Sequence, residues 1–179
     1  LVITGGLDIG PRDSTVVQGA IEACRIHDLA HEILDAREVH ARYPGLVIPE
    51  DHLAVHQPDA GFVMSEQAIA AHATLALADG AEIHGNEPVI DWEPVGDGVV
   101  VRTAEAEYHA RRLVLAAGAW MPRLAAPLRG LAVPERQALV WVAARRPELF
   151  RVGTLPVFIL EDDDGTEWYV FPEYGIPGV

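Results

Sequence analysis

Four neighbouring residues have side chains that can bind a metal ion: Glu50, Asp51, His52 and His56. Two histidines four residues apart are close neighbours on a helix, where they could hold Zn²⁺ together. This segment follows Pro49 and has the pattern of an extended chain. We therefore predict that these residues form no metal site. The acidic run 161–164 lacks the alternating acids and final glutamate of a calcium loop, so we predict a solvated hairpin turn there.

Glycines cluster near the N-terminus in the run Gly5-Gly6-Leu7-Asp8-Ile9-Gly10. The run matches neither G-x-G-x-x-G nor G-x-x-x-x-G-K, so it does not indicate a phosphate-binding loop. We interpret it as a plain turn. The chain also lacks G-x-S-x-G, and its scattered histidines give no Ser/His/Asp spacing, so hydrolase chemistry is not supported.

A ligand contact is suggested by the apolar run 113–117, which leads into Gly118, Ala119 and Trp120. We predict a buried strand over Leu113–Ala117. Small residues after such a strand let a ligand approach the backbone closely. Because buried strands often end in this way without binding anything, the pattern alone leaves both interpretations open.

Charge and composition exclude several classes of protein. The chain has 27 acidic residues against 13 arginines and no lysine, which gives a formal charge of −14. Such a chain is repelled by nucleic acid and by anionic membranes. No apolar run approaches the ~20 residues of a membrane span. The single cysteine, Cys24, excludes an internal disulfide and fits a reducing compartment, so we expect a cytoplasmic protein.

Three helices are predicted from capping residues. Asp13 or Ser14 caps a helix that reaches about His27, and the order Asp35-Ala36-Arg37-Glu38 forms a capping box that opens a short helix ended by Pro44-Gly45. Ser65 caps the clearest helix, 66–79, whose alanine-rich face should pack on a sheet.

Strands are predicted between and after these helices. Period-two or apolar patterns indicate strands at 1–4, 53–56, 81–84, 89–93, 99–103, 107–110, 113–117, 138–144, 157–160 and 167–171. Helices therefore alternate both with single strands and with hairpins. The predicted fold class is α/β with α+β elements, including an antiparallel portion.

The chain as a whole resembles one family of enzymes. Eight short motifs occur in the family's order: Tyr43-Pro44-Gly45, Pro49-Glu50, Pro58-Asp59-Ala60-Gly61, Ser65-Glu66, the unit from Gly80-Ala81 to Val89, Ala117-Gly118-Ala119-Trp120, Arg136-Gln137 and Tyr169-Val170-Phe171-Pro172. The chain is similar over its full length to the interior of monomeric sarcosine oxidase and N-methyltryptophan oxidase. These are FAD-dependent amine oxidases of the D-amino acid oxidase superfamily. Because the chain also starts without a methionine, we expect an internal fragment.

The resemblance implies two interleaved portions. Residues 60–130 would contribute a helix, a small β-meander and a strand to a Rossmann-like FAD domain. Residues 1–59 and 131–179 would belong to a substrate domain, whose mixed sheet should join segments 1–57 and 135–179. The family's G-x-G-x-x-G loop, its flavin-linking cysteine and its active-site lysine have no counterpart in this chain.

The resemblance also implies roles for five residues. Val89 matches a residue whose backbone meets the adenine of FAD, and Ala117, Gly118 and Trp120 match the strand end beside the cofactor. Tyr169 matches a tyrosine that lines the substrate site, and packing across the strands is its alternative role. Alternation places Tyr169 and Phe171 on one face of their strand and Trp168 on the other, whereas a shift of one residue would exchange these faces.

The function implied for the intact protein is oxidation of the amine of an N-methyl or related amino acid, with electrons passing to oxygen. The alternatives are an FAD-dependent amino acid dehydrogenase and a noncatalytic α/β binding module. We expect the 179-residue chain alone to be inactive, to lack FAD, and to self-associate through uncovered apolar surface.

Overall fold

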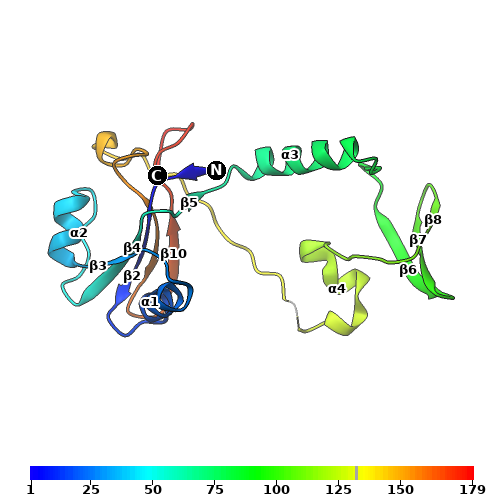
Figure 1. Cartoon of the computed structure of the whole chain (residues 1–179), viewed down its shortest axis with the longest axis horizontal. Helices are drawn as coiled ribbons and strands as arrows, with labels where there is room; N and C mark the ends of the chain where they lie inside the picture. Colours follow the sequence, from blue (N-terminus) through cyan, green and yellow to red (C-terminus); the bar gives the residue numbers. More distant parts are fainter. Residues whose placement is uncertain (132) are drawn as a thin grey trace. The chain divides into compact units, whose positions relative to one another are not determined.

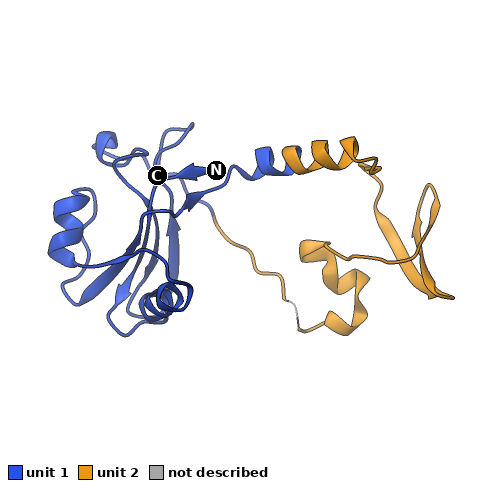
Figure 2. Cartoon of the chain, viewed as in Figure 1, with its two compact units in different colours: residues 1–70, 139–179 blue, residues 71–138 orange. Residues whose placement is uncertain are grey.

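The computed structural model describes residues 1–131 and 133–179, which divide into two compact units (Figure 2). Unit 1 comprises residues 1–70 and 139–179, and unit 2 comprises residues 71–138. Among the described residues, no helix combines the length and apolar character needed to cross a membrane. The division into an FAD portion and a substrate portion stays a prediction.

Unit 1 is built on a five-stranded sheet with the order β10-β9-β2-β4-β3 (Figure 1). The central strand β2 pairs in parallel with β9 and antiparallel with β4. Segments 1–57 and 135–179 therefore share one mixed sheet, as predicted. The strands are β2 (Gly6–Pro11), β3 (Glu32–Asp35), β4 (His52–Gln57), β9 (Val157–Glu161) and β10 (Glu167–Val170), and a separate ribbon pairs β1 (Val2–Ile3) with β5 (Gly61–Phe62).

The plain turn predicted for the glycine-rich run is wrong, because this run forms the central strand β2. Its glycines mark close approaches of the backbone rather than a turn. A Cβ added at Gly6 would lie 2.6 Å from the Cβ of Ala60, and one at Gly10 would lie 2.7 Å from the Oγ of Ser14. The glycines are therefore compatible with a strand that neighbouring segments approach closely.

The two faces of this sheet pack against different helices. Leu7 and Ile9 of β2 are buried on one face, in a core that includes Val39 of α2 (Ala36–Arg42). Leu53 and Val55 of β4 lie on the other face. They pack there against α1 (Thr15–His27).

Two predictions about helix caps are confirmed. Of the two residues predicted to cap α1, Ser14 is the N-cap. The predicted capping box between Asp35 and Glu38 is also present. A short 3₁₀ turn, η3 (Pro147–Leu149), precedes β9.

Unit 2 contains a three-stranded antiparallel meander, β6-β7-β8. Its strands are β6 (Val89–Val95), β7 (Gly98–Thr103) and β8 (Glu107–Ala110), which confirms the strands predicted at these places. Three short helical segments follow: η1 (Gly118–Trp120), α4 (Met121–Leu124) and η2 (Ala126–Leu128). The indole Nε1 of Trp92 on β6 donates a hydrogen bond to the carbonyl oxygen of Leu124, 2.7 Å away, and so ties the meander to α4.

The strands predicted at 81–84, 113–117 and 138–144 are absent from the structure. A strand requires a neighbouring backbone to complete its hydrogen bonds. Segment 113–117 keeps an alternating pattern of partly buried and exposed residues, as an extended chain does, but forms no ladder with a described strand. In segment 138–144, Val142 exchanges two backbone hydrogen bonds with Val179 and forms no longer ladder.

Helix α3 (Ser65–Ala78) contains the boundary between the two units. It begins one residue earlier than predicted, with Ser65 inside the helix. The prediction that its alanine-rich face packs on a sheet is wrong for this chain, because none of its residues is buried. Its apolar residues surround the helix instead of forming one stripe, a pattern typical of helices enclosed by other elements.

Candidate functional site

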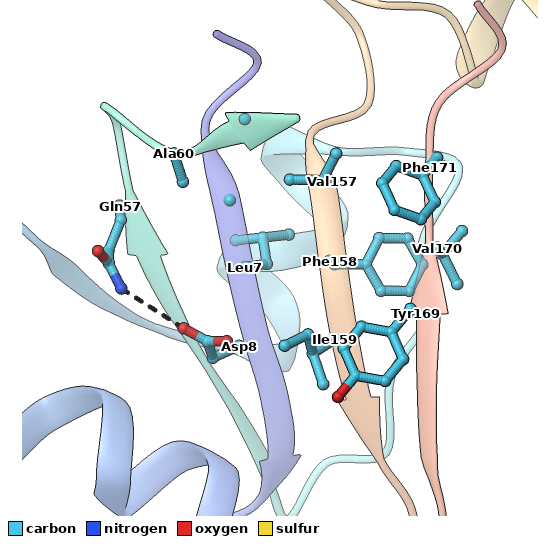
Figure 3. Close-up of a pocket in the computed structure, with 12 residues that line it drawn as sticks. Leu7, Asp8, Gln57, Ala60, Val157, Phe158, Ile159, Tyr169, Val170 and Phe171 are labelled. Carbon is cyan, nitrogen blue, oxygen red and sulfur yellow. Dashed lines mark hydrogen bonds between the residues drawn. The ribbon is translucent and has the colours of Figure 1, made fainter. Parts of the chain in front are cut away.

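A pocket of about 340 Å³ lies on the face of the unit 1 sheet that also carries α1 (Figure 3). Its polar side chains come from Asp8 on β2, Gln57 on β4 and Tyr169 on β10. Its apolar walls come from β9 and the end of β10, and Ala60 and Gly61 border it near β5. Apolar walls with a few polar groups are typical of small-molecule sites.

The strand register brings the polar groups to one face. Asp8 is paired with Ile159 of β9, and Ile159 is paired with Tyr169 of β10. Directly paired residues in adjacent strands point to the same face of the sheet. Trp168 is paired instead with Leu160, which packs against the core on the opposite face. Tyr169 therefore faces the pocket and Trp168 does not, in the register predicted from the sequence.

Asp8 carries the only carboxyl group among the described residues that line this pocket. The amide Nε2 of Gln57 lies 3.5 Å from its Oδ2, at the long limit for a hydrogen bond. Burial raises the pKa of the Asp8 carboxyl above its ordinary value, and the Gln57 amide opposes this rise. The sequence analysis did not identify Asp8 and Gln57 as site residues. The alternation Leu7-Asp8-Ile9 was the signal available for Asp8, because it places one polar side chain on the face opposite two apolar ones.

Tyr169 presents its ring to the open side of the sheet, with 64% of the residue exposed. Its hydroxyl donates a hydrogen bond to Oε2 of Glu167, 3.1 Å away. This bond and the negative charge of Glu167 raise the pKa of the tyrosine hydroxyl. The phenol is therefore neutral near pH 7, and its ring can contact a ligand while its hydroxyl remains accessible.

Aromatic contacts fix the rim of the pocket. The rings of Phe62 on β5 and Phe171 meet edge to face, with centroids 6.1 Å apart. Phe62 also contacts the ring of Tyr174 at 5.2 Å. Such edge-to-face pairs are favourable arrangements of aromatic rings. The β1-β5 ribbon thereby holds Phe171 beside the site.

The residues predicted to contact FAD all lie in unit 2. Ala117 precedes η1, Gly118 and Trp120 are the first and last residues of η1, and Val89 begins β6. Gly118 has a φ of +51°, which favours glycine, and a Cβ added there would meet no atom within 4 Å. Trp120 is 64% exposed. The backbone at Gly118 and the indole ring of Trp120 are therefore accessible to a ligand. Tyr169, in contrast, belongs to unit 1.

These unit 2 residues fit part of an FAD site. Exposed backbone at Gly118 and an exposed indole at Trp120 suit contact with the flat rings of a cofactor. Binding of its pyrophosphate needs a glycine-rich turn at a helix N-terminus, and the sequence contains no such motif.

The histidines near position 50 lie on strand β4, in the extended conformation predicted for them. Within the part of the chain that the structure describes, no group of three His, Cys, Asp or Glu side chains is placed to hold a metal ion. The acidic run forms the predicted hairpin turn between β9 and β10, where Oδ1 of Asp162 accepts hydrogen bonds from the backbone N–H groups of Asp164 and Thr166.

Comparison with known proteins defines the class to which this fold belongs. The family model described as FAD dependent oxidoreductase matches residues 3–176, and the chain belongs to this family. Monomeric sarcosine oxidase from Streptomyces avermitilis is 41% identical over 179 residues, which are 98% of this chain and 46% of that protein. N-methyl-L-tryptophan oxidase from Escherichia coli strain K12 is 31% identical, over 96% of this chain and 45% of that protein.

Among solved structures, the chain is similar to NikD, described as an unusual amino acid oxidase essential for nikkomycin biosynthesis. The TM-score is 0.72 and the identity 27%, over 98% of this chain and 46% of that chain. The chain thus spans about half the length of the relatives it matches.

Proposed function

We propose that the protein containing this chain is an FAD-dependent oxidoreductase that oxidises the amine of an N-methyl or related amino acid and passes the electrons to oxygen. Membership of the FAD dependent oxidoreductase family supports the cofactor. The similarity to sarcosine and N-methyltryptophan oxidases supports this substrate class. The observation that carries the proposal is the pocket on the unit 1 sheet, where Tyr169 faces a small, mostly apolar cavity.

In this proposal unit 1 supplies the substrate site. Tyr169 lines the cavity with its ring against the substrate, and its hydroxyl donates to a carboxylate oxygen of the amino acid, in place of the bond to Glu167. The edge-to-face contact with Phe62 keeps Phe171 at the rim and helps exclude water from the apolar wall.

Unit 2 supplies part of the cofactor contact. Val89, at the start of β6, contributes its backbone beside the adenine. Ala117, Gly118 and Trp120 border the cofactor. Of these three residues, only Trp120 has a large side chain, and the space around Gly118 is open. When bound, FAD supplies the hydride acceptor. Because this chain has no pyrophosphate loop, we propose that it alone neither retains FAD nor turns over substrate.

Two further properties belong to the proposal. The exposed apolar residues of α3, such as Ile69 and Leu75, support self-association of the 179-residue chain when nothing else covers them. The lone, buried Cys24 supports a cytoplasmic location.

The test is steady-state kinetics of the whole flavin-loaded protein with sarcosine and N-methyltryptophan. We expect Tyr169→Phe to raise KM about tenfold, because a hydrogen bond to a charged group is lost, and Trp168→Phe to leave KM unchanged. Weakened binding in Trp168→Phe alone would show that the site assignment is wrong. Amine oxidation without hydrogen peroxide would indicate a dehydrogenase, and a whole protein that binds no flavin would indicate a noncatalytic module.

A further inference from the structure

The pocket contains an acid without a matching base. Among its described lining residues Asp8 carries the carboxyl group, and none is Arg, Lys or His. Its long contact with Gln57 involves Oδ2, and a neutral amide does not neutralise the charge. A partly buried carboxylate is costly unless a positive group or several hydrogen bonds compensate for its lost hydration. The described residues that line the pocket supply no such positive group.

The position of Asp8 is fixed by the sheet. It lies on the central strand β2, where its backbone is paired on both sides, with Val55 of β4 and Ile159 of β9. Its neighbours Leu7 and Ile9 are buried on the opposite face. The carboxylate therefore stays on the pocket face, and in Figure 3 it lies between Gln57 and Ile159. A rigid, charged group in a mostly apolar cavity is suited to selecting its ligand.

The surroundings favour a ligand with both a positive and an apolar part. Ile159 separates Asp8 from Tyr169 across the strands, and Val157 and Phe171 continue the apolar wall. On the side of α1, burial raises the pKa of the Cys24 thiol, and the negative charge of ionised Asp8 adds to this rise. Neither Cys24 nor Gln57 brings a positive charge to the carboxylate.

We propose that Asp8 is a specificity-determining residue of this pocket, whose carboxylate binds a protonated nitrogen of the ligand while the Ile159 and Phe171 side chains contact the ligand's apolar part. The Gln57 amide contacts the same carboxylate from the neighbouring strand β4. The inference rests on the proposed function insofar as that ligand is the amine substrate. Binding of the cation does not itself require oxidation.

The test compares two probes of similar shape on the whole protein. N-methylbenzylamine is protonated at pH 7, and benzyl methyl ether is its neutral counterpart. Dissociation constants are measured by calorimetry for the unchanged protein, for Asp8→Asn and for the matched control Asp163→Asn, which removes the same charge from the exposed β9-β10 turn. We expect Asp8→Asn to weaken binding of the amine about tenfold and that of the ether less than about twofold, with no change in the control.

A second variant guards against a mere loss of folding. Asp8→Glu keeps the charge and is expected to retain the preference for the amine. Equal affinity of the unchanged protein for both probes, equal losses for both in Asp8→Asn, or loss of the preference in Asp8→Glu would overturn the inference.

The two proposals fail differently. Binding of the amine that depends on Asp8, in a protein that oxidises no amine, supports the role of Asp8 and contradicts the proposed function. Oxidation of amines that is indifferent to Asp8→Asn supports the proposed function and contradicts the role of Asp8.

Discussion

Unit 1 and unit 2 differ in how completely they bury their apolar residues. The buried apolar side chains of unit 1 come from both faces of its sheet and include Leu7, Ile9, Val17, Leu34, Val39, Val55 and Leu155. Among the described residues of unit 2, the buried apolar side chains are Val99, Val100 and Ala125. Unit 2 has paired strands, with one irregularity between Val89 and Asp91, but leaves large apolar residues exposed, among them Ile90, Val114 and Trp120.

The difference separates hydrogen bonding from packing. Backbone pairing within the β6-β7-β8 meander is satisfied locally, yet a stable fold also needs apolar area removed from water. Unit 1 meets both needs with its own residues, and its pocket rests on a closed core. Unit 2 presents the residues proposed to contact FAD on a surface with little core beneath it.

The strongest test of this contrast compares two isoleucines in the 179-residue chain. Ile9 is fully buried in unit 1, whereas Ile90 in unit 2 is 62% exposed. We expect Ile9→Ala to lower the free energy of unfolding by about 2–5 kcal/mol, because it leaves a cavity. Ile90→Ala should change it by less than about 0.5 kcal/mol. Urea unfolding measures both, and similar losses would mean that unit 2 has a core of its own.

A glycine in unit 1 gives the next largest effect. Gly6→Ala should destabilise the chain by about 1–3 kcal/mol, because its Cβ would lie 2.6 Å from the Cβ of Ala60 and force strand β2 and its neighbour apart. Gly19 is the matched control. It lies within α1 and has no atom within 4 Å of an added Cβ, so Gly19→Ala should stabilise the chain by about 0.5–1 kcal/mol. Thermal denaturation of both variants checks the opposite signs.

Features that depend on nearby residues were predictable from the sequence. The helix starts at Ser14 and Asp35 follow from side chains that accept backbone hydrogen bonds within three residues. The meander follows from alternation around Gly96-Asp97-Gly98. The face of Tyr169 also follows from alternation.

Features that depend on distant segments were not predictable in this way. The glycines of β2 are explained by Ala60 and Ser14, which pack against that strand in the fold. The long contact between Asp8 and Gln57 joins residues 49 positions apart in the sequence. Segment 113–117 has the composition of a buried strand, but composition cannot supply the partner that a ladder requires.

One directional contact in unit 2, between the meander and α4, can be removed cleanly. Trp92→Phe keeps an aromatic ring but loses the indole N–H that donates to the carbonyl of Leu124. We expect a loss of about 1 kcal/mol, confined to the packing of α4 on the meander. Hydrogen exchange should become faster at the backbone N–H of Ala125, which bonds to Met121 within the α4 turn, and stay unchanged in β2. Faster exchange in both units would instead show that they unfold together.

The smallest expected effect concerns the carboxylate of Glu87, which accepts hydrogen bonds from the hydroxyls of Thr103 at 2.6 Å and Tyr108 at 2.8 Å. The Thr103 bond, followed by the Tyr108 bond, lowers the pKa of Glu87 in the folded chain. A lowered pKa means that the folded state binds the proton less tightly than the unfolded state. The contribution to stability is therefore complete above the ordinary glutamate pKa of about 4.3 and is lost as the pH falls through the lower, folded value.

The test measures the free energy of unfolding of the unchanged chain and of Glu87→Gln as a function of pH. The stability advantage of the unchanged chain over Glu87→Gln should shrink between about pH 5 and the acid limit of folding. Glu135→Gln, at an exposed site in unit 2, is the control for replacing a carboxylate by an amide. A Glu87 advantage that grows as the pH falls would contradict the sign of the shift and with it the hydrogen-bond network that closes this side of the meander.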